Sequence, residues 1–233
     1  MTYSHALVTL SGSDQSLQRM DNYFNHPTIL LHGNASKRNF LKEYYRYKII
    51  QLYTHATDSG STGEPVIYFA DSTLSLSELF YEGRPPTSLI VLSACETAGG
   101  KLYNEEGVFS FNRQFASLGI SCVSTLCQAD NQSTYRITEL FYKYLSKGLP
   151  MDVALQSAKK EFIKSSGREN KLPYYWAAPI LVGQSARIEF PGRFTWGWVT
   201  ALGILAPFGI GGWQVRRRKM QQHKVLPGAA LQT

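Results

Sequence analysis

Short apolar runs alternate with stretches of helical spacing along most of this sequence. Runs rich in β-forming residues lie at 49–53, 66–69, 89–92, 120–126 and 176–182, after a shorter apolar run at 28–31. Helical spacing occurs at 35–45, 107–118, 133–146 and 151–164, with a single helical turn at 76–80. The run at 89–92 is continuously apolar, which is typical of a strand buried on both faces. The alternation predicts an α/β fold with a mostly parallel sheet flanked by helices.

The pattern changes near the carboxyl-terminal end of the chain. Residues 194–215 form a run of 22 residues without a charge, and a helix of that length is roughly 33 Å long, enough to cross a hydrocarbon core of about 30 Å. Trp196 and Trp198 lie at one end of the run and Trp213 at the other, as aromatic residues do at the two membrane interfaces. A buried core helix is the alternative, but Pro207 and several glycines would weaken it more than a helix in lipid.

These boundaries divide the chain into four parts. We expect an α/β domain over residues 1–185, a linker over 186–193, one transmembrane helix over 194–215 and a basic tail over 216–233. The membrane is therefore a predicted partner of residues 194–215.

The net charge of +7 is concentrated in the last of these parts. From residue 186 onward seven basic residues stand against one acidic residue, so residues 1–185 carry only about +1. A basic groove for nucleic acid has no support in the α/β domain. The three cysteines, Cys95, Cys122 and Cys127, include no C-x-x-C pair, which excludes a dense disulfide framework and a zinc ribbon.

Two residues with reactive side chains follow closely on predicted strands. His55 comes just after the run at 49–53, and Cys95 comes just after the run at 89–92. In open α/β sheets active sites form at the carboxyl ends of the strands, so two neighbouring strands would bring the imidazole and the thiol to one crevice. A thiol beside a histidine is a strong nucleophile. Position alone also allows an inert buried cysteine and an ordinary histidine.

Several blocks of the sequence, in a fixed order, are similar to one protein family. They are LIVLSACET at 89–97, IIQLYTH at 49–55, and the segments 10–40, 107–119, 124–130 and 173–183. Together they resemble the CHAT domain, a bacterial family of caspase-like cysteine peptidases often attached to tetratricopeptide repeats. The first block resembles the family's cysteine motif and the second its histidine strand, and the order of histidine before cysteine is that of caspases.

The resemblance implies a caspase-like fold and a cysteine endopeptidase acting on a protein or peptide. In such an enzyme His55 assists the Cys95 thiol, which attacks a peptide carbonyl to form a thioester that water then hydrolyses. The backbone N–H groups of Cys95 and Ala56 would stabilise the developing oxyanion. This chemistry needs no metal and no organic cofactor.

Two positions depart from the family's usual pattern. Ala56 stands where the family has glycine after the histidine, and alanine keeps the N–H but resists positive φ, so a differently shaped or impaired oxyanion hole is expected. Cys127 stands where tryptophan is common. Asp130 matches a recurrent aspartate and would either select a basic side chain before the scissile bond or cap the next helix. Its sequence context, Asp-Asn-Gln-Ser, favours the cap.

The departures leave a second function open, a catalytically weak or inactive caspase-like scaffold or binding module in a membrane-associated signalling protein. Redox sensing by the cysteines has little support, because Cys122 and Cys127 would lie on opposite faces of one strand.

The cations at 216–219 favour a cytoplasmic end after the membrane helix, and therefore an extracytoplasmic domain. We expect this chain to be the C-terminal piece of a longer protein, with tetratricopeptide repeats on the same or a neighbouring chain.

Overall fold

The computed structural model describes residues 10–57, 65–75, 77–79, 85–94, 110–125 and 130–189. The chain divides into two compact units, Met1–Phe190 and Pro191–Thr233, and all described residues belong to the first. The predicted membrane helix over 194–215 lies outside the described residues. Within the described ranges, no helix is long and apolar enough to cross a membrane.

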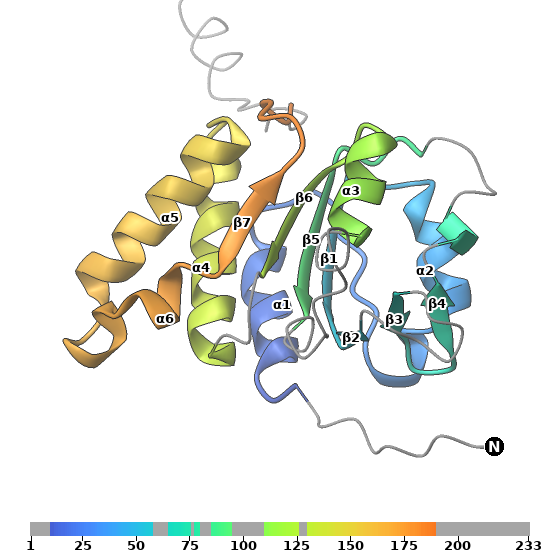
Figure 1. Cartoon of the computed structure of the whole chain (residues 1–233), viewed down its shortest axis with the longest axis horizontal. Helices are drawn as coiled ribbons and strands as arrows, with labels where there is room; N and C mark the ends of the chain where they lie inside the picture. Colours follow the sequence, from blue (N-terminus) through green and yellow to red (C-terminus); the bar gives the residue numbers. More distant parts are fainter. Residues whose placement is uncertain are drawn as a thin grey trace, which may run out of the picture. The chain divides into compact units, whose positions relative to one another are not determined.

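A four-stranded sheet forms the centre of the first unit (Figure 1). Its strands, in spatial order, are β1 (Ile49–Thr54), β5 (Leu89–Ala94), β6 (Ser121–Thr125) and β7 (Pro179–Val182). β1, β5 and β6 run parallel, whereas β7 is antiparallel to β6. The prediction of a mostly parallel sheet is therefore confirmed.

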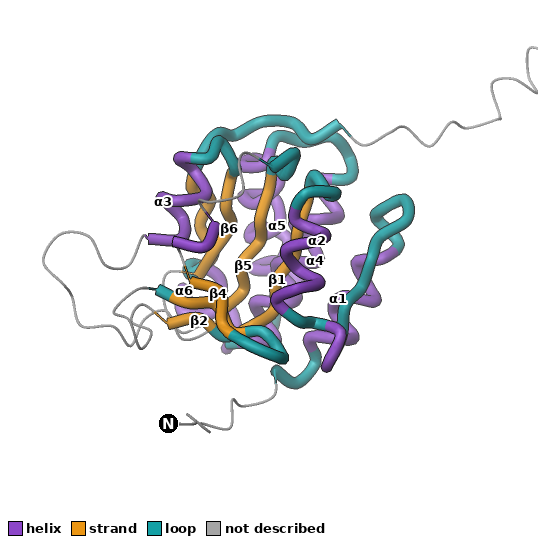
Figure 2. The backbone as a smooth tube through the Cα atoms, turned by 90° about the vertical axis from the view of Figure 1, so that its right-hand side faces the viewer, coloured by secondary structure: helices purple, strands orange, loops and turns teal. Residues whose placement is uncertain are grey.

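A second, smaller sheet follows directly on β1. It contains β2 (Ala56–Thr57), β3 (Val66–Tyr68) and β4 (Thr73–Ser75), all antiparallel. Only His55 separates β1 from β2, so the chain passes from the main sheet to the small one at this residue. In Figure 2 the small sheet lies near the end of β1.

Helices cover both faces of the main sheet (Figure 1). The α-helices are α1 (Ser13–Asp21), α2 (Lys37–Tyr44), α3 (Ser110–Ser117), α4 (Asn131–Leu145), α5 (Met151–Ser165) and α6 (Pro173–Trp176). Single 3-10 turns occur at η1 (His32–Asn34), η2 (Ser77–Leu79) and η3 (Glu169–Lys171). The helices predicted around 35–45, 133–146 and 151–164 are confirmed as α2, α4 and α5, and the turn predicted at 76–80 as η2.

The alternation of side chains along β5 explains why helices pack on both faces of the main sheet. Leu89 and Val91 pack into a hydrophobic cluster with α1, α4 and α5. Ile90 and Leu92 point to the opposite face and pack into a cluster with α2 and α3. All four side chains are at most 3% exposed, as expected of a central strand covered on both faces.

Three segments differ from the sequence-based expectation. Residues 28–31 form no strand, because an apolar run becomes a strand only when another strand pairs with it. The last strand begins at Pro179 rather than at 176, since α6 occupies the residues before it. α1 was not predicted, because Leu17 and Met20 are its only large apolar side chains.

Candidate functional site

The carboxyl ends of β1 and β5 lie side by side. The two strands pair in parallel over their full length, and the last pair in register is Thr54 with Ala94. His55 follows Thr54 and Cys95 follows Ala94 in the sequence, each immediately after this last pair. Cys95 itself lies outside the described residues. The two strands are therefore direct neighbours in the sheet. The pairing of the His55 and Cys95 side chains stays a prediction.

His55 is held between the two sheets by its backbone. The Tyr68 N–H of β3 donates a hydrogen bond to the His55 carbonyl oxygen over 2.9 Å. The Thr54 hydroxyl in turn donates to the carbonyl oxygen of Tyr68. His55 as a whole is half-buried, and its Nδ1 atom is buried. Hydrogen bonds between β1, His55 and β3 therefore fix the backbone that carries the imidazole.

The backbone N–H of Ala56 is directed away from β3. Ala56 pairs with Ile67, and the hydrogen bond from Tyr68 to His55 on one side makes this a non-hydrogen-bonded pair of the antiparallel ladder. In such a pair the N–H groups of both residues point outward from the two strands. β2 is an edge strand of its sheet, so this N–H makes no hydrogen bond within the small sheet.

Alanine is compatible with this position. Ala56 lies in a strand, and the non-glycine residues with positive φ among the described residues are His26 and His32. The whole residue is 1% exposed, and its methyl group packs in the cluster with Ile67 and α2. The departure from the family's glycine therefore requires no unusual backbone conformation here.

A buried polar network ties the two strand ends to α4. The Gln51 Nε2 atom donates a hydrogen bond to the Ser93 hydroxyl over 3.4 Å, so β1 and β5 are bridged four residues before His55 and two before Cys95. Tyr142 donates a hydrogen bond from its hydroxyl to Gln51 Oε1 over 3.1 Å. Burial, together with the neighbouring Tyr53, raises the pKa of Tyr142 well above its ordinary value, so it stays a neutral donor.

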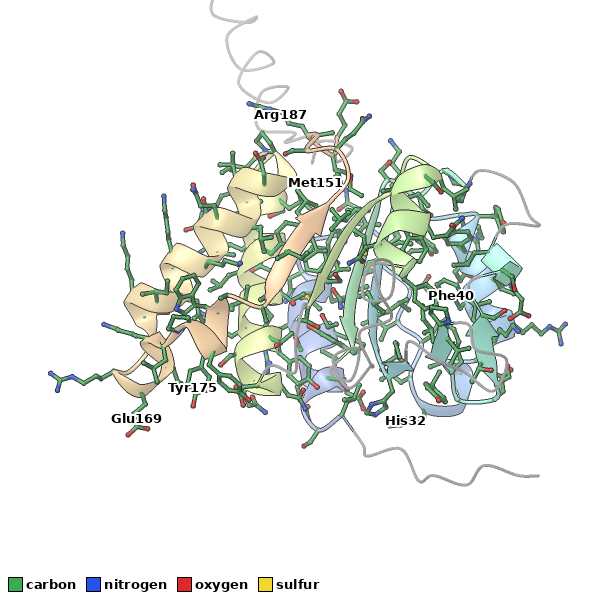
Figure 3. The ribbon with its side chains drawn as sticks, viewed as in Figure 1. His32, Phe40, Met151, Glu169, Tyr175 and Arg187 are labelled. Atoms are coloured by element: carbon green, nitrogen blue, oxygen red, sulfur yellow. The ribbon has the colours of Figure 1, made fainter. Side chains whose placement is uncertain are left out.

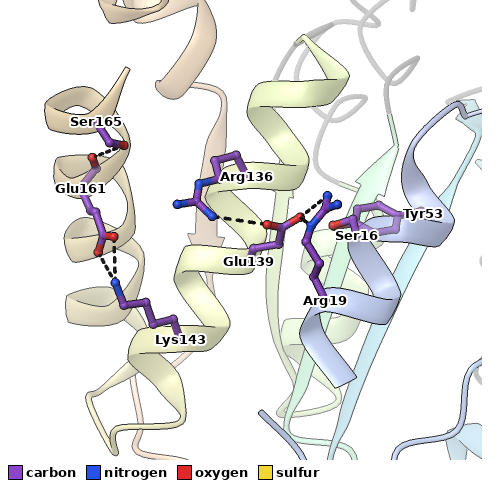
Figure 4. Close-up of polar contacts among 8 residues, drawn as sticks. All are labelled: Ser16, Arg19, Tyr53, Arg136, Glu139, Lys143, Glu161 and Ser165. Carbon is purple, nitrogen blue, oxygen red and sulfur yellow. Dashed lines mark hydrogen bonds and ion pairs between the residues drawn. The ribbon is translucent and has the colours of Figure 1, made fainter. Parts of the chain in front are cut away.

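A second polar cluster holds α1 against α4 (Figure 4). Glu139 of α4 is 7% exposed at its side chain and pairs with Arg19 of α1 over 2.7 Å and with Arg136 over 3.5 Å. Nearby, the hydroxyls of Ser16 and Tyr53 lie 3.0 Å apart. The buried carboxylate thus has two guanidinium partners, as a buried charge requires.

Asp130 forms the amino-terminal cap of α4. Its Oδ2 atom accepts a hydrogen bond from the Ser133 N–H over 2.8 Å, with the extended backbone typical of a cap. The cap that the sequence favours is therefore present. Because α4 follows β6 along the chain, Asp130 lies toward the carboxyl edge of the sheet. Its role in a substrate pocket stays a prediction.

Cys122 is an inert thiol. It lies in β6, is 0% exposed, and burial raises the pKa of its thiol to about 12. A thiolate is the nucleophilic form, so Cys122 has almost none of it at neutral pH. Cys127 lies outside the described residues.

The fold and this edge define an α/β protein with a candidate histidine and cysteine at the ends of two adjacent parallel strands. Among protein families, the model of the CHAT domain matches residues 4–184. The chain therefore belongs to the CHAT domain family, whose members are related to caspase-like cysteine peptidases. No curated protein matches the chain.

Sequence reasoning found the strand ends but missed the polar residues behind them. Gln51 lies among apolar residues in β1, and Ser93 follows four apolar residues in β5. The signal was a polar residue within or directly after an apolar strand run, because a buried polar group needs a hydrogen-bond partner.

Proposed function

We propose that this protein is a cysteine endopeptidase that uses His55 and Cys95. The observation that carries the proposal is the register of β1 and β5, whose last pair, Thr54 with Ala94, immediately precedes the two residues. Membership of the CHAT domain family supports the same chemistry. The inert Cys122 leaves Cys95 as the candidate nucleophile with a histidine at the neighbouring strand end.

In this mechanism the Cys95 thiol gives its proton to the imidazole of His55 while its sulfur attacks the peptide carbonyl carbon. The carbonyl oxygen becomes an oxyanion, and the outward N–H of Ala56, with the N–H of Cys95, would stabilise it. The imidazolium then protonates the leaving amine, and the C–N bond breaks to give a thioester. Water, activated by the same imidazole, hydrolyses the thioester and restores the thiol.

The hydrogen bonds behind the strand ends support this proposal by holding the reacting groups in place. Gln51 and Ser93 join β1 to β5, and Tyr68 fixes the backbone of His55. Catalytic groups on rigid strands lose little entropy when they reach the reacting geometry.

Labelling with a peptide that carries an acyloxymethyl ketone tests the proposal directly. We expect the native protein to be labelled at one cysteine, and Cys95→Ala to abolish labelling and peptide cleavage. Cys122→Ala is the matched control and should leave labelling unchanged, because that thiol is buried. His55→Ala should slow labelling by about 100-fold or more, the usual contribution of a general base.

A folded native protein that neither reacts with the ketone nor cleaves peptides would refute the peptidase and favour the scaffold. Labelling that survives in Cys95→Ala would instead show that the nucleophile is assigned to the wrong cysteine.

A further inference from the structure

Two large apolar side chains project into solvent next to the carboxyl edge of the sheet. Leu172 is 60% exposed and Tyr174 is 56% exposed, far more than other exposed large apolar residues such as Ile29 at 36% and Val153 at 39%. Both lie on one short segment, at the end of η3 and in α6. Adjacent exposed apolar side chains are a common feature of binding surfaces.

This segment is well fixed. The Trp176 indole N–H donates to the Lys171 carbonyl oxygen over 3.0 Å, and Lys159 Nζ donates to the Ala177 carbonyl oxygen over 3.1 Å. Tyr175 and Trp176 pack against the hydrophobic cluster beneath α4 and α5, and Figure 3 shows Tyr175 on the short helix at this corner of the protein. Exposure of the two apolar side chains is therefore a property of an ordered surface.

The sequence that leads up to these side chains is basic. Lys160, Lys164, Arg168 and Lys171 are all exposed, and within the described part of the chain none of them forms an ion pair. Glu161 is paired with Lys143, which leaves Glu169 as the one unpaired carboxylate between residues 159 and 171. We call the six residues Lys160, Lys164, Arg168, Lys171, Leu172 and Tyr174 the basic corner.

The basic corner is connected to the carboxyl edge of the sheet through α6 and β7. α6 leads into β7, whose first residue, Pro179, pairs with Thr125 at the carboxyl end of β6. β5 and β7 are the two neighbours of β6, so the start of β7 lies about 10 Å from the end of β5, two strand spacings away. Leu172 and Tyr174 precede Pro179 by seven and five residues, so a substrate must extend beyond the start of β7 to contact them.

We infer that the basic corner binds an acidic stretch, with an apolar residue in it, in the part of the polypeptide substrate that extends from the scissile bond past β6 and the start of β7. This inference rests on the proposed function. The exposed cations attract carboxylates, and Leu172 and Tyr174 supply the apolar contact that gives an anchor residue its affinity. The substrate class is therefore an acidic, extended segment rather than a neutral or basic one.

Binding to the catalytically inert chain Cys95→Ala tests this inference without cleavage. The probe is a fluorescein-labelled peptide of about twelve residues, with glutamates around one Leu-Phe pair, followed by fluorescence anisotropy. Binding should weaken as NaCl rises from about 50 to about 300 mM, because exposed charges are screened. A lysine peptide with the same Leu-Phe pair, and a glutamate peptide without it, should both bind weakly.

Charge reversal locates the surface. The variant Lys164→Glu, Arg168→Glu, Lys171→Glu should bind the acidic peptide about tenfold more weakly, since it loses three surface ion pairs that are individually weak. Leu172→Ser with Tyr174→Ser should weaken binding independently of salt. The matched control, Arg38→Glu, Lys42→Glu, Lys48→Glu, replaces the same residue types at exposed positions near α2 and should bind normally.

Equal affinity for the glutamate and lysine peptides, or an equal loss in the control variant, would overturn the inference. So would binding to phosphatidylserine vesicles through the same cations with no binding of the peptide, because the surface would then serve a membrane. Cleavage by the native chain separates the two proposals. Peptide binding at the basic corner without any cleavage refutes the peptidase alone, whereas cleavage that is indifferent to the charge reversal refutes the inference alone.

Discussion

Ala56 has two separate roles, one for its side chain and one for its backbone. Its methyl group fills space in the cluster of the small sheet, while its N–H points away from β3. Glycine at this position would keep the N–H but lose the methyl group and gain freedom in the unfolded chain. The family's usual glycine is therefore not the better residue in this particular domain.

We predict that Ala56→Gly lowers the free energy of unfolding by about 1 kcal/mol, through backbone entropy and lost burial. Urea denaturation of the two proteins measures this change. The same variant should cleave peptides no faster than the native protein, since the conformation at Ala56 needs no positive φ. A gain in kcat for Ala56→Gly would show that the oxyanion site is strained by alanine.

The amino-terminal end of α4 is stabilised by one side chain. Asp130→Ala should lower the free energy of unfolding by about 1 kcal/mol, the usual cost of losing an Asp cap. Asp130→Asn should keep most of the stability, because an amide oxygen can accept the Ser133 N–H in the same way. Thermal unfolding of the three proteins compares them.

The asparagine variant also separates the cap from the predicted pocket. If the second carboxylate oxygen binds substrate, Asp130→Asn should lose its preference for Arg or Lys before the scissile bond while remaining stable. Equal selectivity in the variant and the native protein would leave the cap as the role of Asp130.

An ion pair joins α4 to α5. Glu161 accepts hydrogen bonds from Lys143 Nζ over 2.8 Å (Figure 4). It also accepts one from the Tyr144 hydroxyl over 2.7 Å. The Lys143 bond, and then the Tyr144 bond, hold the pKa of Glu161 below its ordinary value. The stabilisation is therefore complete above the ordinary glutamate pKa and is lost as pH falls through the lower folded value.

Glu161→Gln should accordingly lower stability by up to about 1 kcal/mol at pH 7. The difference from the native protein should shrink as the solution is acidified below about pH 4, where the native carboxylate takes up a proton. Urea titrations at several pH values measure it. Glu169→Gln, at an exposed glutamate, is the control and should differ little from the native protein at any of them. A difference for Glu161→Gln that grows on acidification would contradict the sign.

The same elements show what the sequence could and could not predict. β5 was predictable because continuous burial leaves an uninterrupted apolar run, and α4 because its cap and its spacing agree. Trp176, the last residue of α6, was taken for the start of the final strand, since tryptophan favours β structure locally. Pro173 at the first helical position and the packing of Trp176 against the hydrophobic cluster favour the helix instead. β2 and β4, of two and three residues, depend on pairing partners distant in sequence and leave no local pattern.

On the scale of the whole molecule, the α/β fold and the strand ends of the candidate site were predictable from the sequence. The hydrogen bonds of Gln51 and the exposure of Leu172 were not, because both depend on which side chains meet in space. The membrane helix over 194–215 stays a proposal based on its length, its tryptophans and the cations that follow.

This proposal predicts that the chain sediments with membranes and resists extraction by alkaline carbonate, whereas a chain ending at residue 189 is released. In the full-length protein, protease added to intact spheroplasts should digest the α/β domain and spare the segment after Lys219, since the cations at 216–219 favour the cytoplasm. Protection of the domain until the membrane is permeabilised would place it in the cytoplasm and reverse the orientation.

The antiparallel direction of β7 decides how this protein can be attached to a solid support. Residues 184–186 are bound at the starts of β6 and α5, where Ser121 donates to the Gln184 carbonyl oxygen and the Met151 N–H donates to that of Ala186. The described chain thus ends about one strand length, roughly 20 Å, from the carboxyl edge. Gly12, by contrast, lies against Gln132 in the first turn of α4, beside that edge. A sensor chip should therefore capture the domain through its carboxyl end if peptides are to reach His55, while capture through the amino end should slow their access.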